Sequence, residues 1–457
     1  MVRLRRPAEW GVEPVPDSLR VLRTFDLFVL WSSLGAGLLV LAAGALLVTA
    51  FGLSLWEAAI VSLGGSIVGS LLLAAAGHHG SRAGVPTMVS LRPILGRAGS
   101  YAPTALNILQ LLGWTAFELL VMAQGTAIVT RNVLGPWTAA FFVPVWGAVT
   151  MALALGGPLA VVRNWLERFA IWIVYGSTIA IAVALGLHSL DPNLRPPAVA
   201  GAFAGTGSLL LGLDLVVAMP ISWWPLISDY NRFARTPKEA TAGTTFGYIA
   251  ANTSFYLLGA ALAFLGITAF GLNPQDPYTF LATLGLLGLG ALPLIAILVD
   301  ETDNAFADVY SAAVSVQNLS VRRRQATTIV AASLIGVVAA WYLVASGQGI
   351  AGPYEAFLLL IGALFVPLLG VVIAETFVVR RGGYSRSAFF EAAPRWRWPA
   401  FASWIPGTAL YFVIVWFGLP IGATLPSFAL AASLHVVLSR VEQGLVRSSP
   451  AISGGDP

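Results

Sequence analysis

Twelve apolar segments, each long enough to cross a membrane, dominate this sequence of 457 residues. A helix of about 20 apolar residues spans the hydrocarbon core of a bilayer, and a helix satisfies its own backbone polar groups in lipid. Only 10% of the residues are charged, against about 25% in soluble domains. The sequence therefore predicts an all-α integral membrane protein with 12 transmembrane helices. The predicted spans are residues 26–50, 55–77, 103–130, 137–161, 165–187, 201–227, 242–271, 291–317, 326–346, 353–379, 398–418 and 420–439.

The basic residues give the predicted orientation of these spans. If the N-terminus is cytoplasmic, all of the 25 lysines and arginines except Arg131 and Arg195 fall in inner segments. Inner loops of membrane proteins carry such an excess of positive charge. We therefore predict a multi-pass protein of the inner (plasma) membrane, surrounded by the lipid bilayer, with cytoplasmic tails at residues 1–24 and 440–457.

The remaining composition narrows the classes of function. The chain contains no cysteine, which excludes disulfides, iron–sulfur clusters and thiol catalysis. It lacks the sequence motifs of ATP binding and of serine or zinc hydrolases, which argues against an ATP-driven pump and against an enzyme. The net charge of +4 comes from basic residues in the inner loops, so we predict no nucleic-acid partner. No cofactor is predicted, and the oligomeric state is left open.

Four carboxylates interrupt the eighth predicted span: Asp300, Glu301, Asp303 and Asp308 lie within nine residues. An acid at the centre of a span costs roughly 2.5–3.5 kcal/mol on insertion scales. A cluster is therefore retained only where cations, protons or water compensate for that cost, and it predicts a permeation or coupling site. A cation channel, in which the acids form a selectivity ring, is an alternative interpretation.

Two predicted spans are interrupted by residues that break helices. Residues 31–37 of the first span are mostly small and polar, and residues 218–225 of the sixth span include two prolines. Proline removes a backbone donor, and unwound backbone in a membrane must line protein or a water-filled cavity. Interruptions at matching places in two groups of five spans are typical of inverted-repeat transporters with a site near the midplane. The predicted repeats are residues 25–190 and 200–380.

The predicted substrate site combines aromatic faces with polar groups. On the third span, Trp114 and Glu118 are four residues apart and therefore share one helix face. An indole plane can stack on a flat heterocycle, and a carboxylate beside it accepts hydrogen bonds from a ring N–H and an exocyclic amine. A second aromatic face comes from Trp223 or Trp224, which the sequence does not distinguish. The other predicted substrate ligands are Gln124, Ser222 and Asn304.

The predicted cation site joins the acidic cluster to the interruption in the first span. Asp300, Asn304 and Asp308 recur every four residues and form one polar stripe. Oxygen ligands at this density suit a hard cation such as Na⁺, completed by backbone carbonyls of the first span. They suit a proton relay equally well, so the predicted coupling ion is Na⁺ or H⁺. The predicted cation ligands are Ser32, Gly35, Asp300, Asp303 and Asn304.

Four short motifs occur in order along the chain: residues 84–88 with Arg92, Gly113-Trp114, residues 228–233 and residues 308–312. Together they resemble the nucleobase–cation symporter-1 family, the permeases for cytosine, purines, uracil, allantoin, hydantoins and thiamine precursors. The resemblance runs over nearly the whole chain. It implies a LeuT-type fold of two inverted five-helix repeats with alternating access, and two further helices within residues 398–439.

The resemblance also implies roles for single residues. Trp114 falls where the family's substrates stack, while Glu118 departs from a glutamine that commonly follows that aromatic residue. The family's cation site uses hydroxyl groups of the eighth span, which Asp303 and Asn304 largely replace here. The segment from Ser222 onward looks most like the hydroxymethylpyrimidine branch, with cytosine permeases next. The predicted function is cation-coupled import of a pyrimidine-type heterocycle, and a purine, hydantoin or allantoin permease is the alternative.

Overall fold

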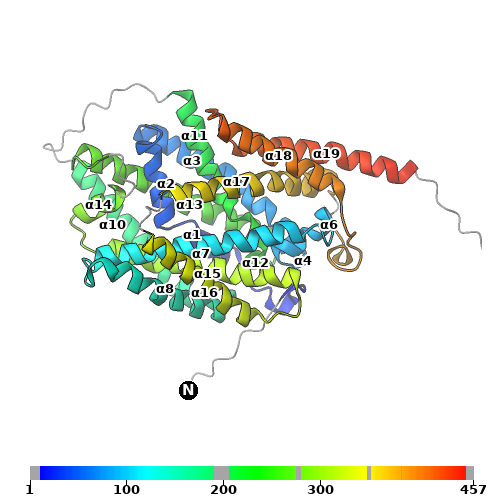
Figure 1. Cartoon of the computed structure of the whole chain (residues 1–457), viewed down its shortest axis with the longest axis horizontal. Coiled ribbons are helices and arrows are strands. Elements are labelled where there is room, and N and C mark those ends of the chain that lie inside the picture. The colour runs from blue at the N-terminus through cyan, green and yellow to red at the C-terminus, as the bar shows by residue number, and fades with distance from the viewer. Residues whose placement is uncertain (1–10, 190–204, 274–278, 347–350, 382, 449–457) are drawn as a thin grey trace, which may run out of the picture.

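The computed structural model describes residues 11–189, 205–273, 279–346, 351–381 and 383–448, which form a bundle of helices (Figure 1). The long helices are α1 (Thr24–Leu34), α2 (Leu38–Thr49), α3 (Leu55–Ala76), α7 (Tyr101–Val129), α8 (Thr138–Gly156), α10 (Ile171–Ser189), α11 (Thr206–Ser222), α13 (Pro237–Thr268), α15 (Leu292–Leu319), α16 (Gln325–Ala345), α17 (Ala351–Ala374), α18 (Trp398–Trp416) and α19 (Thr424–Ser448). Shorter elements include α4 (His78–Ala83), α5 (Thr87–Ser90), α6 (Arg92–Leu95), α9 (Pro158–Val161), α12 (Ile227–Asn231) and α14 (Thr279–Leu286).

These helices follow the predicted spans closely. Within the described ranges, ten helical segments are long and apolar enough to cross a membrane, and the pair α1 and α2 makes an eleventh if it forms one bent span. The eighth predicted span is α15, which carries four acids and lies outside that count. The all-helical membrane class is therefore confirmed, whereas the number of 12 crossings stays a prediction. The predicted outer loop that contains Arg195 lies outside the described residues.

The first span is broken, as its sequence predicts. Helices α1 and α2 are bent by 61° relative to each other across a short gap. Gly37 lies in this gap with a φ of 139°, a backbone conformation that side chains other than hydrogen disfavour. The helix therefore ends at Leu34 and restarts at Leu38, which leaves backbone groups inside the bundle without partners from the helix itself.

The sixth span changes helix type without a comparable bend. Helix α11 ends at Ser222, a 3₁₀ turn covers Trp224–Leu226, and α12 follows directly. Pro220 stays within the last turn of α11, and Pro225 occupies an early position of the 3₁₀ turn, where its missing N–H has no helical partner to lose. The two prolines thus loosen the helix locally and do not redirect it.

Helix packing brings the broken first span against α13 and α15. Helix α1 runs along α13, and α7 runs along α15. At Gly44 of α2 an added Cβ would collide with the backbone of Tyr256 on α13, and at Gly259 of α13 it would collide with the backbone of Leu41 on α2. Glycine at both positions therefore allows the two helices to approach at backbone distance. Helices α18 and α19 lie beside α17 at the edge of the bundle (Figure 1).

The loops predicted to be cytoplasmic meet at one end of the bundle, which we call the basic face (residues 11–23 and the loops that contact them). Arg20 donates from Nε to the Ala234 carbonyl at 3.1 Å and from Nη2 to the Ser81 carbonyl. Arg163 donates from Nη2 to the Val21 carbonyl at 3.2 Å. Segments that precede the first span and follow the second, fourth and sixth spans thus lie together, as alternating crossings require.

Candidate functional site

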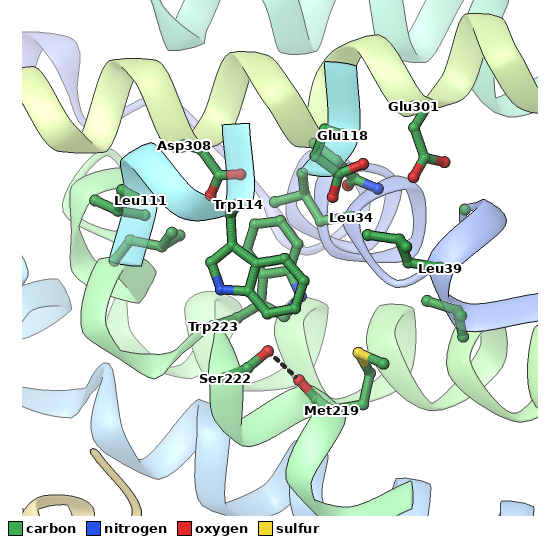
Figure 2. Close-up of a pocket in the computed structure, with 14 residues that line it drawn as sticks. Leu34, Leu39, Leu111, Trp114, Glu118, Met219, Ser222, Trp223, Glu301 and Asp308 are labelled. Atoms are coloured by element: carbon green, nitrogen blue, oxygen red, sulfur yellow. Dashed lines mark hydrogen bonds between the residues drawn. The ribbon is translucent and has the colours of Figure 1, made fainter. Parts of the chain in front are cut away.

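A small cavity, with a volume of about 20 Å³, lies beside the break in the first span. Four parts of the chain contribute to it: the α1–α2 break, α7, the end of α11 with the turn that follows, and α15. Figure 2 shows Trp114 of α7 between the carboxylates of Glu118 and Asp308 and the residues Ser222 and Met219 of α11. The lining residues are Leu34, Gly37, Leu39, Val40, Leu111, Trp114, Glu118, Met219, Ser222, Trp223, Leu226, Glu301, Asn304 and Asp308.

Two indole rings reach this cavity, from Trp114 and Trp223. The Trp114 ring is held from α17 by edge-on contacts with Tyr354 and Phe357, at centroid distances of 6.0 and 5.3 Å. Trp224 has a different place, because it is fully buried and its Nε1 donates to the Phe365 carbonyl at 3.0 Å. Of the two tryptophans that the sequence left open, Trp223 is therefore the one that faces the cavity.

Two glutamates face each other across the cavity wall, Glu118 on α7 and Glu301 on α15. Their side chains are 3% and 0% exposed, and both line the cavity. Oε2 of Glu118 and Oε1 of Glu301 receive no hydrogen bond from the described part of the chain. Since buried acceptors without donors are costly, this pair can accept hydrogen bonds from a ligand or retain a proton.

The break in the first span is held by α15. Oε2 of Glu301 accepts the backbone N–H of Leu38 at 2.8 Å, and Nδ2 of Asn304 donates to the Ala36 carbonyl at 3.1 Å. A Cβ added to Gly37 would lie 2.7 Å from Oε2 of Glu301, so this glycine also permits the close approach. Two side chains of one helix thus satisfy backbone groups on both sides of the gap.

The predicted cation residues are only partly brought together. Asp300 accepts a hydrogen bond from Ser33 Oγ at 2.9 Å, and neither carboxyl oxygen of Asp303 has a donor among the described residues. The hydroxyl of Ser32 contacts the hydroxyl of Tyr175 on α10 instead. Gly35 packs toward Ala251 of α13, where an added Cβ would lie 3.2 Å from the alanine side chain.

Most of the predicted substrate residues lie together. Trp114, Glu118, Ser222, Trp223 and Asn304 all line the cavity. Gln124 is not among the lining residues, because it lies ten residues beyond Trp114, about 15 Å further along α7. The Ser222 hydroxyl is engaged by its own helix, since it donates to the Met219 carbonyl at 2.7 Å.

Sequence reasoning did not select Glu301, Asp308, Gly37 or Ser33 as site residues. The two acids belong to the cluster at residues 300–308, so composition pointed to their region. The direction in which their side chains point could not be predicted from the sequence, because it depends on how α15 packs against the gap between α1 and α2. Within the described residues no group of three or more His, Cys, Asp and Glu side chains is placed to hold a metal ion.

A second set of contacts closes the bundle between the cavity and the basic face. Trp31 of α1 donates from Nε1 to Oδ1 of Asn231 at 2.8 Å, and the Tyr230 hydroxyl donates to the Ala307 carbonyl at 3.0 Å. The backbone N–H of Thr87 donates to Oδ1 of Asp229 at 3.0 Å. The residues 228–233 and 84–88, which carry part of the family resemblance, therefore form one buried junction.

Comparison with known proteins places the chain in a family. Residues 14–432 match the family described as "Permease for cytosine/purines, uracil, thiamine, allantoin", and the chain belongs to this family of permeases. The allantoin permease of Bacillus subtilis (strain 168) is 23% identical over 375 residues, which cover 76% of this chain and 74% of that protein. The cytosine permease of Escherichia coli (strain K12) is 23% identical over 365 residues, covering 76% of this chain and 79% of that protein.

A solved structure shows the same fold. Mhp1, a nucleobase-cation-symport-1 family transporter in a closed conformation with bromovinylhydantoin bound, matches with a TM-score of 0.77 and 18% identity over 96% of each chain. The predicted family and the LeuT-type architecture are therefore confirmed. The members of this family are permeases and not enzymes.

Glu301 should stabilise the protein mainly as an acceptor for the second half of the broken span. We expect Glu301→Leu to lower stability by about 1–3 kcal/mol, because the buried N–H of Leu38 loses its partner. Glu301→Gln should be milder, because the amide oxygen can still accept that N–H. Thermal unfolding of the purified protein measures both, and equal melting temperatures for the two variants would contradict this role.

Proposed function

We propose that this chain is a secondary transporter that imports a flat nitrogen heterocycle together with a cation by alternating access. The observation that carries the proposal is the cavity beside the α1–α2 break, where two indole rings and the Glu118 carboxyl meet. An aromatic platform with an adjacent directional acceptor suits a planar ring that carries N–H groups. The relatives named above, permeases for allantoin and cytosine, support a substrate of this kind.

The polar lining favours a substrate rich in hydrogen-bond donors. Three carboxyl side chains reach the cavity, from Glu118, Glu301 and Asp308, and an ionised carboxylate only accepts hydrogen bonds. The Nδ2 group of Asn304 is already bonded to Ala36. A pyrimidine with an exocyclic amine, such as hydroxymethylpyrimidine or cytosine, offers the matching donors. A purine, hydantoin or allantoin substrate is the alternative within the same family.

The cation is proposed to bind where α15 meets the end of α1. Asp300, Asp303 and Ser33 gather there, and burial of two carboxyl groups without a basic partner requires a positive charge. A proton or a sodium ion meets that requirement. Asn304 and the carbonyls exposed by the break extend the same oxygen-rich region toward the substrate cavity. We therefore propose one continuous region for ion and heterocycle, with H⁺ or Na⁺ as the coupling ion.

The proposed topology has α15 as the twelfth crossing. Its 28 residues extend about 42 Å at 1.5 Å per residue, longer than the hydrocarbon core of a bilayer. The distribution of basic residues supports cytoplasmic termini and an inner-membrane location. The five-span repeats are proposed at residues 25–190 and 200–380, with α18 and α19 outside them.

Trp114→Ala should remove the stacking surface and prevent transport. We expect proteoliposomes with the natural chain to take up labelled cytosine or hydroxymethylpyrimidine and to show counterflow. In the variant, binding should be about 10- to 100-fold weaker, because base–aromatic stacking contributes roughly 1–3 kcal/mol. Trp404→Ala is the control, because Trp404 is also buried but lies on α18 outside the cavity. Unchanged affinity in Trp114→Ala would remove the stacking claim, and unitary conductance in place of counterflow would favour a channel.

Glu118→Gln should change the ranking of substrates more than the stability of the protein. The amide offers an NH₂ donor group and a carbonyl acceptor where the carboxylate offers acceptors only, so amino-substituted rings should lose about tenfold relative to oxo-substituted rings. Competition of cytosine and uracil against labelled substrate measures the ranking. Glu57→Gln is the control, because Glu57 is buried at the start of α3, away from the cavity. An identical ranking in Glu118→Gln would show that this carboxyl does not contact the ligand.

Asp303→Asn should weaken the dependence of uptake on the coupling ion. The amide keeps the shape of the side chain but removes a buried charge, so the half-saturating Na⁺ or H⁺ concentration should rise about tenfold. Asp214→Asn is the control, because Asp214 is a partly buried acid that accepts the backbone N–H groups of Ala423 and Thr424 outside the cavity. Uptake measured over a range of pH and of Na⁺ decides which ion responds, and no change in either would place the coupling site elsewhere.

A further inference from the structure

A second cavity lies at the basic face, separate from the substrate cavity. Its volume is about 230 Å³. Three segments that are distant in the sequence form it: the end of the N-terminal segment, α4, and the stretch after the tenth predicted span. Its lining residues are Arg20, His79, Arg82, Ala83, Tyr384, Arg386 and Phe389.

This cavity concentrates positive charge. Three arginines line it, and none of its lining residues is acidic. Arg82 and Arg386 form no hydrogen bond or ion pair with the described part of the chain. Of the two nearby acids, Asp17 lies 4.0 Å from Arg20 and its side chain is 97% exposed, so water weakens its attraction. The other, Glu375, accepts the hydroxyl of Tyr384 from behind the cavity wall and is paired with Arg397 at 2.8 Å.

The repulsion within the cluster is visible at Arg20. Burial lowers the pKa of its guanidinium, and the charge of Arg386 lowers it further against the attraction of Asp17. The other two arginines of the cavity, Arg82 and Arg386, are exposed side chains. Such an arrangement is stabilised by an anion that contacts them together.

The inner wall of the cavity supplies a further polar group. His79 is 3% exposed, and its Nε2 has no hydrogen-bond partner among the described residues. Its ring packs on those of Tyr384 and Phe389, with centroid distances of 5.4 and 6.4 Å. A buried imidazole nitrogen without a partner is costly, and a ligand that enters the cavity can remove that cost.

We propose that this cavity binds the phosphate group of an anionic ligand. Guanidinium groups bind phosphate oxygens in bidentate geometry, and the three arginines together with the unpartnered imidazole fit a compact oxyanion better than a neutral molecule. The phosphate comes either from the headgroup of an anionic phospholipid or from a small soluble phosphate compound. The two sources share the chemistry that the cavity recognises.

A bound phosphate would connect the segments that meet at the basic face. Arg20 already links the N-terminal segment to the carbonyls of Ser81 and Ala234. A phosphate that contacts Arg20, Arg82 and Arg386 adds the segment after the tenth span to this link. Occupancy therefore stabilises the arrangement in which the basic face is closed.

The test is thermal unfolding of the purified full-length protein with two sources of phosphate. One arm adds inorganic phosphate in detergent against chloride at equal ionic strength. The other arm compares nanodiscs of phosphatidylcholine with and without phosphatidylglycerol. We expect a higher melting temperature in at least one arm, and Arg386→Gln and Arg82→Gln should each raise the half-saturating concentration about tenfold. Arg381→Gln is the matched control, because Arg381 is an exposed arginine of the same segment outside the cavity.

The outcomes separate the sources and the proposal itself. Stabilisation by inorganic phosphate alone identifies a soluble ligand, and stabilisation by phosphatidylglycerol alone identifies a lipid headgroup. In either case the effect must weaken in the two cavity variants and persist in Arg381→Gln. Absence of stabilisation in both arms, or an equal loss in the control, would overturn the proposal. These measurements need no transport activity, so their result is independent of the proposed substrate.

Discussion

The site depends on how the unpaired backbone of the broken first span is satisfied inside a membrane. Lipid offers no hydrogen bonds, so every N–H and C=O that leaves the helix must find a protein partner, water or a ligand. Helix α15 provides two such partners, because Glu301 accepts the N–H of Leu38 and Asn304 donates to the carbonyl of Ala36. The break between α1 and α2 therefore depends on the contacts that α15 makes with it. Glu301 and Asn304 belong to the polar segment that looked unfavourable in the sequence, and their contacts make the break possible.

The buried acids of α7 and α15 carry charges that bound protons, a cation or a ligand must compensate. Glu118, Asp300, Glu301, Asp303 and Asp308 are all at most 3% exposed, and no ion pair joins any of them to a basic residue in the described ranges. Unpaired buried carboxylates cost far more than the stability of a protein permits. Protons, a cation and the donors of a substrate can each lower that cost. In the proposed mechanism, ion and substrate act on one set of charges, which would give the two binding events a free energy of interaction.

Much of the fold could be predicted from the sequence, because the hydrophobic pattern dictates which segments cross and the basic loops indicate their direction. The predicted span 55–77 corresponds to α3, and 326–346 corresponds to α16, within one or two residues. The break in the first span was also predictable, since Gly35 and Gly37 follow a pair of serines. The sixth span was harder, because prolines reveal where hydrogen bonds are lost but not whether the axis bends. Pro220 remains helical, and the axis continues.

Site residues were less predictable wherever the choice depended on helix rotation. Ser32 and Ser33 are adjacent, yet about 100° of rotation separates them on a helix, so one contacts Tyr175 and the other contacts Asp300. A similar change of facing separates Trp223, which lines the cavity, from Trp224, which is buried against Phe365. Sequence gives the residue types and their depth in the membrane. The direction in which a side chain points is decided by the neighbouring helices. In a bundle whose helices are apolar on most sides, periodicity alone does not specify that direction.

Helix α1 connects the proposed cation region with the closure of the basic face. Ser33 contacts Asp300, and two residues earlier Trp31 donates to Asn231 at 2.8 Å. Both contacts belong to one helix of 11 residues, and a short helix moves as a unit. A displacement that separates Ser33 from α15 therefore also withdraws Trp31 from α12. The charge state of Asp300 and Asp303 can thus bias whether the basic face is closed. In the alternating-access proposal, α1 therefore couples ion binding to the closure of the basic face.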